Sequence, residues 1–467
     1  MNFARPPRFT GTDHRRDHRR LADSDPILLK PLFNIYQRKV HRLTRTLRPH
    51  ELYENGPENP VFLNRIGLFL TSSETSDPVF AEFRLARERA RLEVTGKPIE
   101  LDVGHYRSRV SDYERRQYAL ALARYDPKAA AAWLIEGEWD LKAAFALAAG
   151  DLAAGFAAAG RLSADIKKSK DLHVILAALH SHANEFQQSR QYLKSLLTDA
   201  RNLDSASNSP LSLLDFLGQN GDLAPSTPAD GALVSVIICA YNAAPFIGAA
   251  LRSVLNQNYP NVEIISIDDG SQDHTFEQMR QIADENPRIT AHRFANNGAY
   301  ASRNIGLRLA RGEFITFLDA DDIMLPHRIS SQLAALEHSG AAATVSRLIR
   351  ISEDGRLAAP RIYPFVRHNP CSLMMRRSTA VTVGDFDESR FGADEEYEHR
   401  IALRLGKSAL LRTAGIHTLA LHRAGSLTQS PDSGLATMAG RQARIAYRES
   451  WIRRHRLLAA QGQAATL

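Results

Sequence analysis

Three aspartates in the second half of the chain directly follow a short apolar segment. Phe314 to Leu318 reads FITFL, which is typical of a buried β-strand, and Asp319, Asp321 and Asp322 come next. In a doubly wound sheet, the ligand crevice lies just beyond the carboxyl ends of the strands. Carboxylates crowded there repel one another unless a cation lies among them, and Mg2+ or Mn2+ prefers such oxygen ligands. Asp319 and Asp321 are therefore predicted to form a metal–diphosphate site; the alternative is a polar loop in which Asp322 caps a helix.

The elements that must position these aspartates alternate along the second half of the chain. Apolar segments predict strands at 234–240, 262–267, 289–294 and 314–318, and helical periodicity fills 244–256, 276–286 and 301–310 between them. Strands and helices that alternate at this spacing predict βαβ units and a parallel sheet.

Polar residues also follow the first two of these strands. Tyr241 and Asn242 come after the first strand, and Asp268 and Asp269 end the second. Because strand ends of a parallel sheet meet at one edge, these residues and the aspartates after Leu318 are expected to converge on one crevice. No G-x-G-x-x-G fingerprint and no Walker sequence follows the first strand, which argues against a dinucleotide dehydrogenase and a P-loop enzyme. The pattern favours a nucleotide held by carboxylates and a metal ion.

The composition is that of an ordinary soluble protein with room for two or three domains. The 467 residues are 44% hydrophobic and 24% charged, with a net charge of +7. No apolar run reaches the roughly 18 residues of a membrane span, and the first residues lack a secretory apolar core. Cys239 and Cys371 match no metal spacing, and we interpret them as reduced thiols, as expected in the cytosol.

The positive charge is concentrated at the ends of the chain. Residues 1–50 hold twelve Lys or Arg against four Asp. Such a segment could bind anionic lipid or simply be a solvated face, and no nucleic-acid-binding signature is present, so we expect no nucleic-acid partner. Apolar positions from Lys30 to Arg48 recur at helical spacing among basic residues, which predicts an amphipathic helix that lies on a membrane surface or packs on its own domain.

The predicted domain organisation has five parts. We expect a basic, partly disordered segment at 1–110, an all-α domain at 111–203 and a turn-rich linker at 204–231. The alanine-rich helical part could be solenoid-like, and so able to bind a protein partner, or a plain bundle. Residues 232–430 form the α/β domain, and 431–467 are a basic helical extension that covers that domain or touches anionic lipid.

Three stretches of the α/β part carry a family resemblance. They read VSVIICAYNAAPFIGAALRSVLNQNYPNVEIISIDDGSQDHT, NNGAYASRNIGLRLARGEFITFLDADD and NPCSLMMRRSTAVTVGDFDESRFGADEEYEHRIALRLG. In this order they resemble the family 2 glycosyltransferases over roughly residues 232–430. The resemblance implies a GT-A fold, which is a Rossmann-like, mainly parallel sheet flanked by helices; here it would follow the all-α domain.

The resemblance also implies which residues hold a nucleotide. Tyr241 would pack against the base, with the backbone near Cys239 beside it. Asp269 would accept the uracil imide N–H, which suits an acceptor-only carboxylate, and Asp268 would either support that turn or be only a turn residue.

Diphosphate and metal contacts are implied for later motifs. Arg303 and Asn304 of the SRN sequence would lie close to the diphosphate or the base, although Asn304 could serve packing alone. Asp319 would lie near the ribose and sugar, and Asp321 would ligate the Mn2+ or Mg2+ ion. His422 matches a histidine that the family often carries near the metal or diphosphate; a surface histidine is the alternative.

The catalytic base implied by the resemblance is Asp394 in FGADEEYEHRI, six residues before Arg400. Transfer with inversion requires a base opposite the leaving diphosphate, within about 3 Å of the acceptor hydroxyl. Ala393 stands where the family often has an acidic residue, which leaves Glu395 as the second choice. An acidic helix start that merely complements the macrodipole is the structural alternative.

These features together predict a metal-dependent inverting glycosyltransferase that uses a nucleotide-sugar, most simply a UDP-sugar, and a hydroxyl acceptor. By analogy, such enzymes build cell-surface polysaccharides or glycolipids on lipid-linked acceptors, which predicts a cytoplasmic protein that could contact the inner membrane face. A sugar nucleotidyltransferase is a first rival, but CAYNAAP lacks the glycine-rich loop that such an enzyme needs. A second rival is a non-catalytic nucleotide-binding scaffold for polysaccharide assembly.

Overall fold

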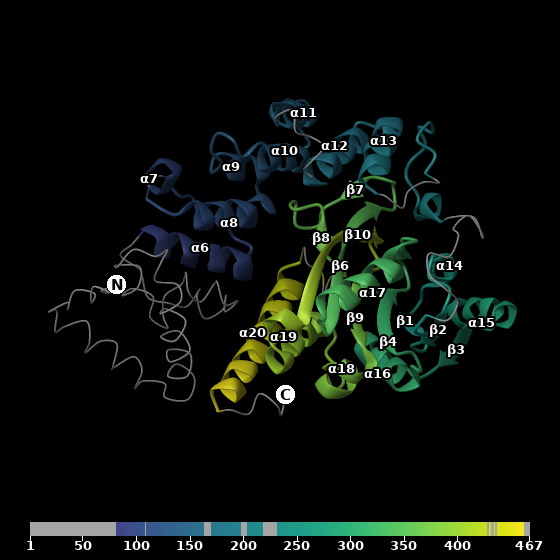
Figure 1. Ribbon diagram of the computed structural model, residues 1–467. Coiled ribbons are helices and arrows are strands. Elements are labelled where there is room, and N and C mark those ends of the chain that lie inside the picture. The colour runs from purple at the N-terminus through teal and green to yellow at the C-terminus, as the bar shows by residue number, and fades with distance from the viewer. Residues whose placement is uncertain are drawn as a thin grey trace, which may run out of the picture. The chain divides into compact units, whose positions relative to one another are not determined.

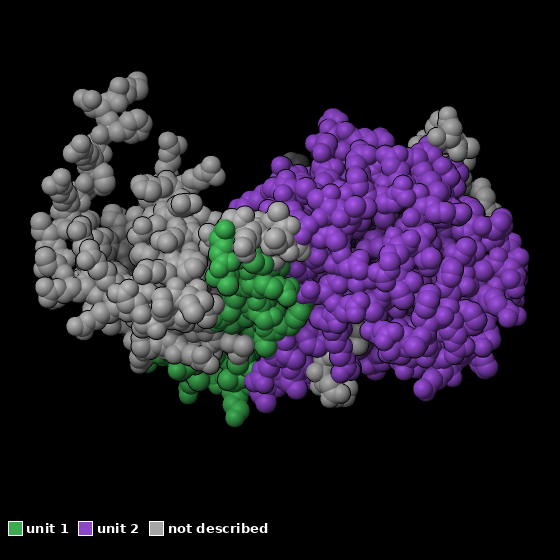
Figure 2. All heavy atoms as spheres, turned by 90° about the horizontal axis from the view of Figure 1, so that it is seen from below, with its two compact units in different colours: residues 1–114, 445–467 green, residues 115–444 purple. Residues whose placement is uncertain are grey.

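A computed structural model of the chain describes residues 81–107, 109–162, 170–197, 203–217, 231–426, 429–430, 434 and 437–461. The predicted amphipathic helix at 30–48 and the predicted disorder near the N-terminus lie outside these residues. Contacts divide the chain into two compact units, residues 1–114 with 445–467, and residues 115–444 (Figure 2).

The smaller unit contributes helical elements. They are α6 (Ala81–Thr95), α7 (Val103–Arg107), the first residues of α8 (Asp112–Ala123) and the last residues of α20 (Met438–Ala460). Arg89 of α6 is buried and forms an ion pair of 3.0 Å with Glu114 of α8. Removal of either partner would leave the other as an uncompensated buried charge, which is strongly destabilising.

The larger unit begins with the alanine-rich helices that the sequence predicted. They are α9 (Pro127–Ala131), α10 (Trp139–Ala148), α11 (Leu152–Arg161), α12 (Lys170–His182) and α13 (Phe186–Leu196). Helices α10 and α11 form one antiparallel hairpin and α12 and α13 a second (Figure 1). The side chain of Asp151 accepts from Ala154 N at 3.0 Å and caps the start of α11, directly after Gly150 ends the previous helix at a positive φ of 76°.

A ten-stranded sheet follows these helices. Its strands are β1 (Val234–Ala240), β2 (Val262–Asp268), β3 (Ile289–Arg293), β4 (Phe314–Asp319), β5 (Ile323–Met324), β6 (Ala343–Ser352), β7 (Leu357–Ala358), β8 (Arg367–His368), β9 (Met374–Arg376) and β10 (Leu410–His422). The main path runs β3-β2-β1-β4-β9-β6-β10-β5, and β7 and β8 pair with β6. The predicted α/β class is confirmed, and the four strands predicted from the sequence pair in parallel as β3-β2-β1-β4.

The other half of the sheet is mixed rather than mainly parallel. Strand β9 runs antiparallel to both β4 and β6, whereas β6 and β10 are parallel. Short antiparallel strands at β5, β7 and β8 extend this half. Sheets of α/β proteins commonly combine a parallel part with antiparallel strands.

Helices cover both faces of the sheet, and each face has its own core. On one face α14 (Ala244–Leu255), α15 (Thr275–Glu285) and α17 (Arg328–Ser339) share one hydrophobic core with residues of β1, β2 and β4. On the other face lie α16 (Ala299–Leu309), α18 (Arg377–Val383) and α19 (Ala393–Leu405). Gly306 lets α16 approach the sheet closely, because a Cβ at this position would collide with Ile237 of β1.

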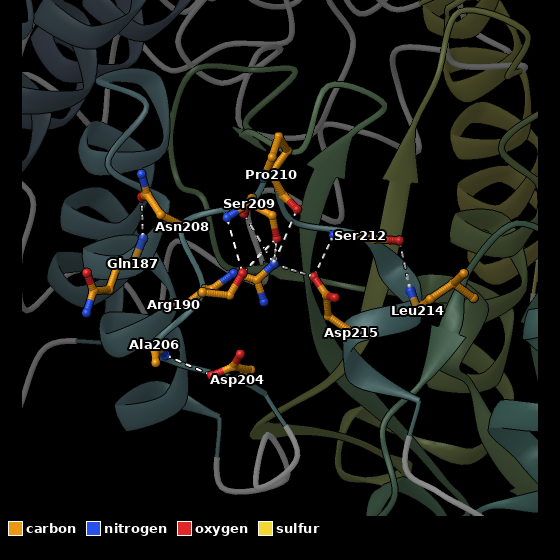
Figure 3. Close-up of polar contacts among 11 residues, drawn as sticks. Gln187, Arg190, Asp204, Ala206, Asn208, Ser209, Pro210, Ser212, Leu214 and Asp215 are labelled. Atoms are coloured by element: carbon orange, nitrogen blue, oxygen red, sulfur yellow. Dashed lines mark hydrogen bonds and ion pairs between the residues drawn. The ribbon is translucent and has the colours of Figure 1, made fainter.

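The first part of the predicted linker is packed against α13. Arg190, which is almost fully buried, donates hydrogen bonds to Ser209 and Pro210 and forms a 2.7 Å ion pair with Asp215 (Figure 3). Asp215 lies in the short 3-10 helix η2 (Leu213–Phe216), and Ser212 caps that helix. Residues 203–217 are therefore an ordered connection, while 218–230 lie outside the described residues.

The helical region also contacts the edge of the sheet within the larger unit. His182 lies 3.2 Å from the carbonyl oxygen of Leu357, and Arg356 donates to Asn184 at 3.0 Å. The hydroxyl of Tyr363 donates to Asp140 of α10 at 2.8 Å. A protein partner of the helical region stays a prediction. Within the described residues, no helix combines the length and the apolar character that crossing a bilayer requires.

Candidate active site

The carboxyl ends of β1, β2 and β4 lie side by side in the sheet. The register aligns Ala240 with Asp268 and Cys239 with Asp319. This neighbourhood follows from the strand order, because β1 lies between β2 and β4. The structure thus brings together the polar residues that follow these three strands, although their roles in a reaction stay predictions.

The two aspartates at the end of β2 hold adjacent turns. Asp268 is fully buried, accepts from Ser271 N and forms a 3.2 Å ion pair with Arg293. Asp269 accepts at Oδ1 from Asn297 N and Ser302 Oγ, and at Oδ2 from Gly298 N at 2.9 Å. These bonds fix the loop that leads into α16, and they leave one lone pair, on Oδ2 of Asp269, for a further donor.

The loop after β1 exposes one large aromatic side chain. Tyr241 is 47% exposed, whereas Asn242 has a positive φ of 49° and is fixed by two hydrogen bonds. Its N–H donates to Ser271 Oγ and its Oδ1 accepts from Gln272 N, each at 2.9 Å. Asn242 therefore joins the β1 and β2 loops and leaves the Tyr241 ring open to a ligand. Burial raises the pKa of the Cys239 thiol to about 12, so this thiol stays neutral.

Arg303 connects the end of β4 to Cys371, which the sequence analysis interpreted only as a reduced thiol and not as a site residue. Its Nη2 atom donates to Asp319 Oδ1 at 2.8 Å and to Cys371 Sγ at 3.2 Å. The Cys371 thiol also contacts Asp319 Oδ1, at 3.1 Å. The Asp319 side chain is 48% exposed while that of Arg303 is 8% exposed, so a buried guanidinium holds a carboxylate that solvent and ligands can reach. The position of Cys371 within the motif NPC was the only sequence signal for it.

The next two aspartates are more buried and repel each other. Asp321 accepts from Arg423 Nε at 2.8 Å, and Asp322 accepts from Leu421 N at 3.1 Å. Burial and repulsion from Asp319 raise the pKa of Asp321, and burial with repulsion from both neighbours raises that of Asp322 further. A cation near this loop would relieve the repulsion. Asp322 makes its contact to β10 rather than capping a helix.

The predicted base, Asp394, lies in the first turn of α19 and faces the same group of side chains. Burial, followed by the negative charge of Asp394, raises the pKa of the Tyr300 phenol, and the charge of Asp394 also acts on Arg303 together with that of Asp319. Arg444 of α20 also lies near Asp394 and Tyr300. Asp319 and Asp394 therefore flank one arginine, which is the proximity that a donor and an acceptor site must have.

The other carboxylates of α19 differ in environment. Glu395 is exposed, while Glu396 is buried and forms a 2.8 Å ion pair with Arg400. Glu398 is buried beside Arg412, and burial raises its pKa to about 7. Glu396 is thus occupied by a structural contact, and Glu395 stays the alternative base.

Two of the predicted residues make other contacts. The amide of Asn304 is bonded in both directions to the Phe386 backbone, at 3.0 and 2.8 Å. This is the packing role that the sequence left open. His422, at the end of β10, lies 3.4 Å from Gln429, and burial and the charge of Arg350 lower its pKa. The neighbouring Arg423, which the sequence did not single out, is the residue that contacts Asp321.

A cavity of about 360 Å3 adjoins Asp321 and Asp322. Leu211 to Leu214 of the connecting segment form one wall, and Pro245, Phe246 and Ala249 of α14 form another. The segment that precedes the α/β part therefore shapes the surface next to the acidic loop, by which we mean residues 319–322. Among the residues that the structure describes, no three His, Cys, Asp or Glu side chains are positioned to hold a metal ion.

Several known proteins are similar in sequence to part of this chain. Residues 235–397 match the family model described as glycosyl transferase family 2. A UDP-Glc:alpha-D-GlcNAc-diphosphoundecaprenol beta-1,3-glucosyltransferase of Escherichia coli, WfaP, is 40% identical over 22% of this chain and 41% of its own length. A second such enzyme of that organism, WfgD, is 37% identical over 23% of this chain and 42% of its own length.

An uncharacterized glycosyltransferase of Haemophilus influenzae is 42% identical over 22% of this chain and 41% of its own length. Among solved structures, S. aureus TarS in complex with UDP-GlcNAc matches 42% of this chain and 60% of that chain, at 18% identity and a TM-score of 0.34. The chain spans about two fifths of the length of the first curated relatives it matches. Residues 235–397 are identified as a family 2 glycosyl transferase domain, as the sequence predicted.

Proposed function

We propose that this protein is an inverting glycosyltransferase that moves a sugar from a UDP-sugar to a hydroxyl group of a lipid-linked saccharide. The observation that carries the proposal is the grouping of Asp319, Arg303 and Asp394 beside the carboxyl ends of β1 and β4. The names of WfaP and WfgD describe transfer from UDP-Glc to a GlcNAc unit on diphosphoundecaprenol. They support a UDP-sugar donor and a lipid-linked acceptor for this chain.

The nucleotide would bind across the ends of β1 and β2. The exposed ring of Tyr241 offers a flat apolar surface for the base, and the loop that holds the ring is fixed by Asn242. Asp269 would accept the imide N–H of uracil with a lone pair that its three protein donors leave open. A base without a donor at that position would leave this carboxylate short of one hydrogen bond.

Asp319 and Asp321 would hold the Mg2+ or Mn2+ ion. The fit rests on the three carboxylates within residues 319–322. Burial and mutual repulsion raise the pKa values of two of them, Asp321 and Asp322. Mg2+ is commonly held by one or two carboxylates together with substrate phosphates, so two protein ligands suffice. When bound, the ion would offset negative charge on the departing diphosphate. Arg423, beside Asp321, would add a second positive charge to the same region.

The transfer step would use Asp394 as the general base. Asp394 takes the proton of the acceptor hydroxyl while the hydroxyl oxygen forms a bond to the anomeric carbon. The bond from that carbon to the diphosphate oxygen breaks on the opposite side, and UDP leaves with the electron pair. Attack opposite the leaving group inverts the configuration. Arg303 would keep Asp319 in place below the sugar through the two contacts at its Nη2 atom.

A UDP-release assay on the full chain tests this proposal. UDP-sugars would be supplied with Mn2+ and a lipid-linked saccharide, and UDP formation would be followed with time. Asp394→Asn is expected to reduce kcat by about 100-fold or more, because a positioned base contributes about 10²–10⁴ in rate. Asp284→Asn, an exposed aspartate of α15, is the matched control and should retain full activity. Full activity of Asp394→Asn would contradict the assignment of the base.

We further propose that the reaction takes place at the cytoplasmic face of a membrane. The support is the lipid part of the acceptor named for the relatives and the twelve Lys or Arg among residues 1–50. Co-sedimentation with anionic vesicles, lost at high salt and absent with neutral vesicles, is the expected result. Equal recovery with both kinds of vesicle would contradict an electrostatic contact.

A further inference from the structure

A short edge strand places one arginine on the same face of the sheet as an arginine of β6. In the pairing of β8 with β6, Arg367 lies opposite Leu348. Residues directly opposite in an antiparallel pair share a face, and so does the residue two positions on along the strand. Arg367 therefore shares its face with Arg350 of β6. Arg350 in turn lies close enough to Asp322 and His422 to shift both of their pKa values.

Arg367 is surrounded by charge of its own sign. The positive charges of Arg361, Arg350 and Arg124 all act on it, and the charge of Glu395 acts in the opposite direction with a smaller effect. Burial and these three arginines lower the pKa of Arg367 to about 9. In the described part of the chain, its guanidinium makes no hydrogen bond or ion pair with another side chain. A half-buried guanidinium in such a setting raises the free energy of the folded protein unless an anion lies beside it.

This arginine cluster, Arg124, Arg350, Arg361 and Arg367, adjoins both halves of the candidate active site. Arg350 is close enough for its charge to act on Asp322 of the acidic loop, and Glu395, the residue after the proposed base, is close enough for its charge to act on Arg367. The acceptor must reach the base from a side that the donor does not occupy. An anion held by the arginine cluster would therefore lie on the acceptor side of the reaction.

We propose that the arginine cluster binds a phosphate or diphosphate group that belongs to the acceptor. The term acceptor rests on the proposed function, whereas the anion site itself does not. Arginine suits this ligand because its planar guanidinium donates pairs of hydrogen bonds to phosphate oxygens and keeps its charge near neutral pH. The site would select acceptors that carry a phosphate group next to the sugar over neutral glycosides.

A binding experiment tests the anion site without any turnover. Inorganic diphosphate is titrated calorimetrically into the full chain that has been saturated with UDP in excess Mg2+, so that the donor site is filled. Binding is expected for the wild type and should weaken by about tenfold or more in Arg367→Gln. Arg280→Gln, an exposed arginine of α15 with the same loss of charge, should bind as the wild type does. The affinity for UDP should be equal in all three proteins.

Stability separates a binding role from a structural one. Because the Arg367 guanidinium is repelled by its neighbours and has no hydrogen-bond or ion-pair partner among the described residues, Arg367→Gln should melt no lower than the wild type without ligand. Added diphosphate should raise the melting temperature of the wild type more than that of the variant. Three results would each overturn the proposal. The wild type could fail to bind diphosphate beside UDP, Arg367→Gln could bind diphosphate as well as the wild type does, or that variant could bind UDP more weakly. The last result would assign the cluster to the donor.

An acceptor comparison then identifies the source of the anion. Two acceptors with the same sugar are compared, one an alkyl diphosphate-linked saccharide and the other the neutral alkyl glycoside. The wild type should prefer the charged acceptor by about tenfold or more in kcat/KM, and Arg367→Gln should lose the preference with the neutral acceptor unaffected. Equal use of both acceptors by the wild type would overturn the acceptor assignment. If no acceptor is glycosylated at all, the proposed function fails and the binding result still decides whether the cluster is an anion site.

Discussion

Replacement of Glu398 by glutamine should stabilise the protein in a pH-dependent way. Glu398 is only 5% exposed on α19, and its Oε2 accepts from Arg412 at 2.8 Å. Its Oε1 is buried with no hydrogen-bond partner among the described residues. Burial raises its pKa to about 7, although Arg412 acts in the opposite direction. Glutamine resembles the protonated glutamate in size and polarity and cannot ionise.

The magnitude follows from the two pKa values. Below the ordinary pKa of 4.5, the Glu398 carboxyl is protonated in both the folded and the unfolded state. Folding then buries a neutral group, so no charge has to be desolvated. As the pH rises from 4.5 to 7, the unfolded chain releases its proton first, so folded stability falls through this window. Each unit of difference between the folded and unfolded pKa is worth about 1.4 kcal/mol. The full loss of folding free energy above pH 7 is therefore about 3 kcal/mol. At pH 5 the same penalty is only about 1 kcal/mol.

Melting temperatures of the wild type and Glu398→Gln from pH 5 to pH 8 measure this difference. The variant should gain little at pH 5 and several degrees at pH 8, since about 1 kcal/mol corresponds to roughly 2–4 °C in a unit of this size. Glu285→Gln, an exposed glutamate of α15, should show no such trend. Destabilisation of Glu398→Gln by the same amount at both pH values would refute the reasoning, because it would mean that the Arg412 ion pair outweighs burial.

Three further substitutions test other parts of the structure. Asp269→Asn should weaken UDP binding by about tenfold or more and lower the melting temperature, because an amide N–H would face Gly298 N–H; unchanged calorimetric affinity would contradict the uracil contact. Arg303→Lys should reduce kcat/KM by about tenfold or more, since an ammonium cannot reproduce a guanidinium shared by Asp319 and Cys371; wild-type rates would argue against it. Arg190→Ala should lower the free energy of unfolding measured in urea by about 2–3 kcal/mol, because it removes buried hydrogen bonds and an ion pair to the connecting segment. An unchanged urea midpoint would show that other contacts hold this segment.

The parallel half of the sheet could be predicted because its strands are buried on both faces. Such strands appear in the sequence as continuous apolar segments, and β1 occupies the predicted 234–240. The short antiparallel strands of the mixed half could not be predicted in the same way. Strand β9 has only three residues, and β7 and β8 have two each, which is too short for any periodicity to appear.

The candidate site was predictable where residues follow strands and not where distant segments complete it. Asp269 and Asp319 lie at strand ends, so the order of strands alone brings them together. Cys371 is 52 residues from Asp319 and Arg423 is 102 residues from Asp321, and no local pattern reveals such contacts. Asn304 has a polar side chain in a promising motif, but the Phe386 backbone satisfies both ends of its amide.

A crystal structure of the full chain with UDP and Mn2+ would test the central claim most directly. We predict uracil against Tyr241 and Asp269, and a diphosphate whose metal ion is bound by Asp319 and Asp321, with Asp394 open to the acceptor side. UDP bound elsewhere, for example in the cavity walled by Leu211 to Leu214, with Asp269 and Asp319 free of ligand, would contradict the account.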